Sequence, residues 1–228
     1  MISINSDKKI YKEGSVNDGN MLPGNLSRLP DESLFLKDTL VFVDAGFLSK
    51  LSFYFGNEKY LVYDLNNFAK YLCEKQELNC KQIFYYTAPP FQNAIPTKIE
   101  ERKKEGYDRF IKKLKRKEII VREGRCQRLK INGNLVFHQK AVDVCLAMDL
   151  TNIPIKFPEV KKIILIASDS DFVPVIKNLE ENGIETILHT YYEKKRNFNF
   201  SRSNDLIKSV YKYVLISKDD FDNCPLEK

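Results

Sequence analysis

The stretch KKIILIASDSDFVPVIKNLEENGIETILHT, residues 161–190, decides the fold. It holds two apolar, β-branched runs, at 161–168 and 185–190, on either side of a segment with helical character. The pattern predicts a strand, a helix over Asp171–Asn182 and a second strand. Gly183 marks the end of the helix, because glycine readily takes the left-handed conformation found there. Two strands joined by a helix form a βαβ unit, so we expect parallel strands.

The same alternation extends over most of the chain. Further strands are predicted at 40–45, 82–88 and 118–124, and further helices at 47–55, Asp64–Glu77, Thr97–Lys117, Lys140–Leu150 and Ser203–Tyr213. Residues 125–139 alternate on both sides of Asn132-Gly133, a pair that favours a tight hairpin turn. We therefore expect an α/β fold with a mainly parallel central sheet, helices on both faces and a small β-hairpin.

The pattern also suggests domain limits. Residues 1–37 are polar and show no period, so we expect an N-terminal arm with a short helix near Ser33–Lys37. A single folded domain is expected over 38–216, and a C-terminal tail over 217–228.

Composition narrows the class of protein. The chain has 228 residues, of which 43% are hydrophobic and 30% charged, an ordinary globular balance. No apolar run suits a membrane helix, and the start of the chain does not resemble a signal peptide. None of the five cysteines is spaced like a CxxC zinc pair, so we expect free thiols in a cytoplasmic protein. The sequence leaves open whether the chain forms a homo-oligomer.

Positive charge is concentrated in one segment. Between Lys98 and Lys130 there are fourteen Lys/Arg and six Asp/Glu, a net of +8, whereas the whole chain carries +6. Such an excess suits a polyanion such as RNA or DNA. A solvated, lysine-rich helix face explains the same charge equally well.

Four aspartates are expected near one edge of the sheet. Asp44 and Asp169 each end a predicted strand, and ligands bind at the carboxyl ends of such strands. Asp171 lies in the first turn of the following helix, and Asp143 lies near the buried face of the helix over 140–150. Taken singly, each has a structural explanation. Asp44 could start a turn, and Asp143 could pair with Lys140. Asp169 or Ser170 could cap a helix, and Asp171 could complement the helix macrodipole.

Taken together, these carboxylates favour a metal site. Like charges close together repel and raise each other's pKa, and a divalent cation removes that conflict. Ligands that are all oxygen suit Mg²⁺ or Mn²⁺. An acidic metal cluster beside a basic segment suggests phosphodiester hydrolysis, with water as the nucleophile.

Three segments, in this order, resemble the NYN domain, a branch of the PIN-like nucleases, and in particular its LabA-like group. They are VFVDAGFL (41–48), QKAVDVCLAMDL (139–150) and ASDSDFVPVIKNLEENGIET (167–186). The resemblance implies a three-layer αβα PIN-like (Rossmann-like) fold and a Mg²⁺- or Mn²⁺-dependent ribonuclease.

Carried over by position, the resemblance assigns roles to seven residues. The catalytic and metal-binding residues it implies are Asp44, Asp143, Asp169 and Asp171. It further suggests substrate or supporting roles for Ser168, Lys140 and Asp149. Asp149 is six residues from Asp143, which places it well around the helix.

Other functions remain open at this point. Many relatives have Asn where this chain has Phe47, which favours an RNA-binding or partner-binding module with little catalysis on the same fold. A haloacid-dehalogenase-like phosphatase would have D-x-D-x-T after the first strand, but Asp44 is followed by Ala-Gly-Phe. A Toprim-type metal site would have Glu at that position.

Overall fold

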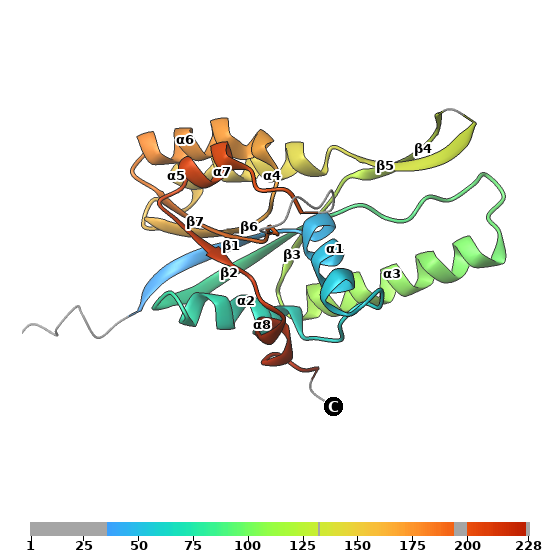
Figure 1. Cartoon of the computed structure of the whole chain (residues 1–228), viewed down its shortest axis with the longest axis horizontal. Coiled ribbons are helices and arrows are strands. Elements are labelled where there is room, and N and C mark those ends of the chain that lie inside the picture. The colour runs from blue at the N-terminus through green and yellow to red at the C-terminus, as the bar shows by residue number, and fades with distance from the viewer. Residues whose placement is uncertain (1–35, 132, 194–199, 227–228) are drawn as a thin grey trace, which may run out of the picture. The chain divides into compact units, whose positions relative to one another are not determined.

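The computed structural model describes residues 36–131, 133–193 and 200–226. Its centre is a six-stranded sheet in the order β3-β2-β1-β6-β7-β8, in which every neighbouring pair is parallel (Figure 1). The strands are β1 (Lys37–Asp44), β2 (Leu78–Thr87), β3 (Ile120–Glu123), β6 (Lys162–Ile166), β7 (Glu185–Thr190) and β8 (Lys212–Leu215). A separate antiparallel hairpin consists of β4 (Arg125–Ile131) and β5 (Asn134–Lys140).

Helices cover both faces of the sheet. One face packs against α1 (Ala45–Phe55), α2 (Leu65–Glu74), α3 (Lys98–Arg116) and α8 (Lys218–Asp222). The other packs against α4 (Val142–Thr151), α5 (Ile153–Lys156), α6 (Val173–Glu181) and α7 (Asn204–Lys208), with the short 3₁₀ turn η2 (Ser170–Phe172). The expected α/β class, with its parallel sheet between two helical layers and its added hairpin, is confirmed.

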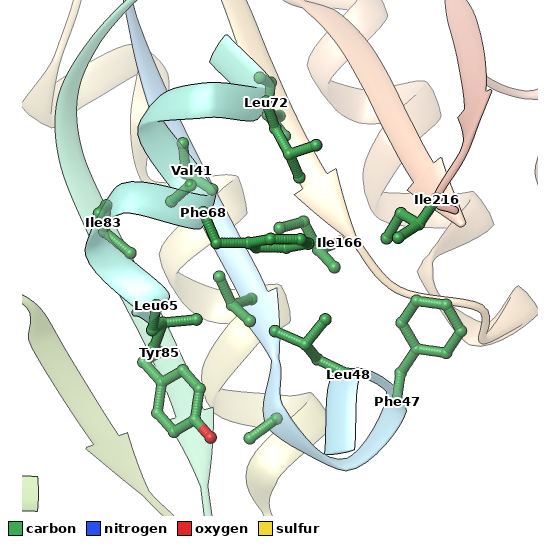
Figure 2. Close-up of a cluster of buried hydrophobic side chains, with 14 of the residues drawn as sticks. Val41, Phe47, Leu48, Leu65, Phe68, Leu72, Ile83, Tyr85, Ile166 and Ile216 are labelled. Carbon is green, nitrogen blue, oxygen red and sulfur yellow. The ribbon is translucent and has the colours of Figure 1, made fainter. Parts of the chain in front are cut away.

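The two faces hold two separate cores, because successive strand residues point to opposite sides. Val41 faces the α1–α2 layer, where Phe68 and Leu72 of α2 lie above it (Figure 2). Phe42 faces the α4–α6 layer and stacks on Phe84 with ring centroids 4.9 Å apart. Burial on both faces explains why β1 reads as a continuous apolar run.

Local signals set the helix limits. Asp64 caps α2 by accepting hydrogen bonds from the backbone amides of Asn66 (3.0 Å) and Asn67 (3.1 Å). Thr97 and Glu100 form a capping box at the start of α3, an arrangement that satisfies two amides at once. After α6, Gly183 takes a φ of +73°, as expected of a residue just past a helix end.

The C-terminal part corrects one prediction. We expected one helix over Ser203–Tyr213, but α7 ends at Lys208 and the chain then adds β8 as an edge strand. Beyond it, Phe221 of α8 and Cys224, just after that helix, are buried against the α1–α2 core. Of the helix expected near Ser33–Lys37, residues 33–35 lie outside the described residues and Lys37 begins β1.

The strand order creates a switch point. From β1 the chain builds outward through β2 to β3, and later returns to β6 on the other side of β1 before continuing to β7 and β8. In open parallel sheets a crevice forms at such a point, outside the carboxyl ends of the strands. Here that crevice lies where β1 and β6 end.

Candidate active site

Two of the four predicted aspartates follow the two strands at the switch point. Asp44 is the last residue of β1, and its Oδ1 accepts hydrogen bonds from the amides of Gly46 (2.8 Å) and Phe47 (3.2 Å). Asp169 caps η2, and its Oδ1 accepts from the amide of Asp171 at 2.9 Å. Within the described ranges, both carboxylates make these hydrogen bonds through Oδ1 alone, which leaves each Oδ2 available to another ligand.

Asp169, rather than Ser170, is therefore the cap, and capping does not compete with ligand binding. A carboxylate has two oxygens, and one is enough to satisfy the amides at a helix start. The same hydrogen bonds fix the orientation of each side chain at the sheet edge.

Asp143 reaches the site from the hairpin side. It is the second residue of α4, which begins after Ala141. Ala141 has a φ of +67°, and this left-handed conformation costs a residue with a Cβ about 1 kcal/mol. This strained residue makes the turn from β5 into α4 and so sets the position of Asp143.

The charges of the four aspartates affect the pKa values within the group. The pKa of Asp44 is raised to about 6, mainly by burial and also by the charges of Asp143 and Asp169, against the lowering effect of the backbone hydrogen bonds. Asp143 was expected near the buried face of its helix but is exposed; partial burial of its carboxylate and the charges of Asp169 and Asp171 still raise its pKa. Asp44, Asp143 and Asp169 thus lie close enough to repel one another, and Asp171 lies close enough to act on Asp143.

The donor set fits a hard divalent cation. It consists of carboxylate oxygens, and no lysine or arginine in the described part of the chain forms an ion pair with any of the four. The side chains are nevertheless not already gathered: among the described residues, no three acidic, His or Cys side chains have the spacing of a metal site.

A cleft of about 350 Å³ opens beside these carboxylates. Its lining combines carboxylates, hydroxyls, a lysine and aromatic rings: Asp44, Gly46, Phe47, Lys50, Ser168, Asp169, Tyr191, Phe200 and Ser201. The ring of Phe200 packs edge-on against Tyr191 at 5.2 Å, and Lys50 Nζ lies 5.0 Å from the Phe200 centroid. Such a lining offers contacts for both a phosphate and a base.

Sequence reasoning missed Lys50, Tyr191, Phe200 and Ser201. The rule that pointed to Asp44 and Asp169 also applies to Tyr191, since it directly follows β7 at the same edge of the sheet.

The three residues with suggested supporting roles lie in different places. Ser168 is exposed and lines the cleft. Lys140 is exposed at the end of β5. The Asp149 carboxylate accepts a hydrogen bond from the Tyr86 hydroxyl (2.9 Å) and pairs with Arg122 Nε (3.0 Å), so it ties α4 to β2 and β3.

One end of the β4–β5 hairpin also lies beside the candidate site. A methyl group placed on Gly46 would lie 3.2 Å from Asp44 Oδ1 and 3.9 Å from the side-chain oxygen of Gln139 on β5. Glycine at position 46 therefore lets the Asp44 carboxylate approach α1 closely, whereas the hairpin end lies at ordinary contact distance.

A three-layer αβα fold with aspartates at its switch point is the architecture of the PIN-like nucleases. The family model of the NYN domain matches residues 38–214, and the chain belongs to this family. NYN domains are generally nucleases that act on RNA. A comparison with curated proteins finds no match.

None of the described helices is both long and apolar enough to cross a membrane.

Proposed function

We propose that this protein is an endoribonuclease that hydrolyses RNA phosphodiester bonds with Mg²⁺ or Mn²⁺ held by Asp44, Asp143 and Asp169. One observation carries the proposal. Three carboxylates from three elements meet at the switch point: the charges of Asp143 and Asp169 help to raise the pKa of Asp44, and the charge of Asp169 helps to raise that of Asp143. None of the three has a cationic partner in the described structure. Such an arrangement is unfavourable for folding and is explained by a function that needs the negative charge.

Each side chain has a role in this proposal. The Oδ2 atoms of Asp44 and Asp169 would bind the cation directly, with Asp143 completing the set from α4. Asp171 is in the first turn after Asp169 and would act through water. When bound, the cation would supply a hydroxide near neutral pH and stabilise charge on the scissile phosphate.

The cleft would hold the nucleotide at the cleaved bond. It is lined by the hydroxyls of Ser168 and Ser201 and by Lys50. The hydroxyls can donate to phosphate oxygens, and the lysine adds positive charge. Tyr191 offers a ring edge beside Phe200 for contact with a base.

The basic segment 98–130 provides a route for the remaining RNA. An open groove of about 580 Å³ beside α3 is lined by four cationic and two acidic side chains: Lys104, Lys112, Lys115, Arg116, Asp108 and Glu123. Contacts there would be to phosphates and would carry no sequence information.

We also propose a cytoplasmic location, which is supported by the thiols rather than by the fold. All five cysteines are free, and two of them, Cys73 and Cys224, are buried. Free thiols persist in reducing compartments, which supports a cytoplasmic protein.

The test is cleavage of a labelled RNA with Mn²⁺ by wild type, Asp169→Asn and the matched control Asp219→Asn, an exposed position in α8. Asparagine keeps the cap that Asp169 provides but removes its charge. The proposal expects wild type and Asp219→Asn to cleave and Asp169→Asn to be at least about 100-fold slower. Equal rates for all three proteins, or no cleavage by any, would refute it.

A second function has one specific observation in its favour. The resemblance to the NYN family leads us to expect asparagine where this chain has Phe47, whose side chain is buried in the α1–α2 core and offers no polar group. A protein that binds RNA without cutting it is the alternative. RNA binding unchanged by EDTA, with no product on a gel, would favour this alternative.

A further inference from the structure

The β4–β5 hairpin presents one continuous face that starts at the candidate active site. Cross-strand partners in the hairpin are Cys126 with Gln139, Arg128 with Phe137 and Lys130 with Leu135. Residues two apart on a strand share a face, so these three pairs lie on the same side, about 7 Å apart. Gln139, at the inner end, has its side-chain oxygen beside Gly46, two residues after Asp44.

Large apolar side chains on this face are left in solvent. Phe137 is 56% exposed and Leu135 is 59% exposed. Phe137 packs against Phe91, from the loop before α3, with centroids 5.6 Å apart. Figure 1 shows the hairpin and that loop extending from the same edge of the sheet, beyond the ends of β1 and β2.

The side chain of Arg128 adds a positive charge beside the Phe91 and Phe137 rings. The Arg128 guanidinium lies 4.8 Å from the Phe91 centroid, and its Nη1 donates to Asn93 Oδ1 at 2.7 Å. Arg128 is therefore held in place rather than mobile. Residues 125–140 contain four Lys/Arg and no Asp or Glu, so the hairpin has positive charge without compensation along its own length.

Exposed rings interleaved with fixed positive charge are the features that bind single-stranded nucleic acid. Bases stack on aromatic rings whatever their sequence, while cations contact the backbone. A duplex does not offer its base faces, so it cannot use such a ring. A protein partner would be expected to match the four positive charges with acidic residues, whereas RNA supplies that negative charge at every nucleotide.

We propose that the face formed by Arg128, Lys130, Leu135 and Phe137, with Phe91, is a platform for single-stranded RNA. A base stacks on Phe137, the cations contact neighbouring phosphates, and the strand continues past Gln139 to the carboxylates. This inference rests on the proposed function and names its substrate class as unpaired RNA. It also makes the platform a binding site that is separate from the cleavage chemistry.

The test measures binding without cleavage. The full chain carrying Asp169→Asn is titrated, in EDTA, against a fluorescein-labelled oligouridylate of about 12 nucleotides, and affinity is read by fluorescence anisotropy. Phe137→Ala and Phe137→Trp are compared in this background. The matched control is Tyr211→Ala, because Tyr211 is also an exposed ring (61%) near a cation, Lys162, but lies just before the amino end of β8.

The platform predicts that Phe137→Ala weakens binding by about 5- to 100-fold, the effect expected for loss of one stacked base. Phe137→Trp and Tyr211→Ala should bind as the parent does, and binding of an RNA duplex should not respond to Phe137→Ala. Equal affinity of Phe137→Ala and Tyr211→Ala for the single strand would overturn the inference. So would an equal loss for the duplex.

Two further readouts distinguish the platform from a dimer interface and from the cleavage chemistry. Sedimentation of the parent and Phe137→Ala tests whether the exposed face joins two copies of the chain; a dimer lost in the variant would overturn the RNA assignment. If platform binding is as predicted while wild type cleaves no RNA, the proposed function fails and the platform stands. If wild type cleaves RNA while Phe137→Ala binds normally, only the platform fails.

Discussion

Replacing Asp44 by asparagine should stabilise the metal-free protein at neutral pH, although it alters the candidate active site. Asparagine caps helices about as well as aspartate, so the hydrogen bonds from Gly46 and Phe47 should persist. What the substitution removes is a charge that is buried and repelled by Asp143 and Asp169.

The size of the effect follows from the pKa of Asp44. That pKa is about 6 in the folded protein, against 3.8 for an ordinary aspartate. A difference of about two units corresponds to about 3 kcal/mol. Between pH 3.8 and 6 the folded state binds more protons than the unfolded state, so the free energy of unfolding falls as pH rises through this window. Above pH 6 the whole penalty is present, and below pH 3.8 it is absent.

Urea denaturation in EDTA, near pH 8 and near pH 4, measures this effect. Asp44→Asn should be more stable than wild type by up to about 3 kcal/mol at the higher pH, with little difference at the lower one. Addition of Mn²⁺ should then stabilise wild type but not the variant, because only the folded wild type binds the ion.

Asp64→Asn is the matched control. Asp64 caps α2 in the same way but pairs with Lys117 at 2.6 Å. Although burial opposes it, this partner keeps the pKa of Asp64 below its usual value. Asp64→Asn should therefore be less stable than wild type at the higher pH, the opposite sign. An Asp44→Asn variant that is also destabilised near pH 8 would refute the reasoning.

Three further substitutions test other parts of the account. Ala141→Gly should raise stability by up to about 1 kcal/mol in a thermal melt, because glycine takes the φ of +67° found there without strain; an unchanged or lower midpoint would contradict this. Gly46→Ala should weaken Mn²⁺ binding about tenfold in a titration without unfolding the protein, because the new methyl crowds the Asp44 carboxylate; unchanged affinity would count against the site. Asp149→Asn should destabilise the fold by about 2 kcal/mol by breaking its pair with Arg122, while RNA cleavage continues; lost cleavage at unchanged stability would give Asp149 a role in catalysis.

The sequence predicted most of the sheet because its strands are buried on both faces. Four consecutive residues of β1 (40–43) and four of β6 (163–166) are apolar, and a short, β-branched run of this kind favours a strand that is buried on both faces. Edge strand β8 was mistaken for helix because it has four residues, of which only Val214 is half-buried. The sequence of β8 therefore shows no alternation of apolar and polar residues that would distinguish this strand from a continuation of α7.

The sequence could predict the site residues that lie at the ends of strands, but not those whose positions depend on how the helices pack. Asp44 and Asp169 could be placed because parallel strands end at a common edge. The left-handed φ of Ala141 could not, because alanine gives no sign of it. The pairing of Asp149 with Arg122 depends on how α4 lies across β3, which no local pattern specifies.

The central claim is that the switch-point aspartates bind a divalent cation. The most direct measurement is anomalous diffraction from a crystal of the full chain soaked in Mn²⁺. The account predicts a Mn²⁺ peak within coordination distance of Asp44, Asp143 and Asp169, at about 2.1 Å from their oxygens. A soaked crystal without a peak there, or with its peak only elsewhere on the protein, would contradict it.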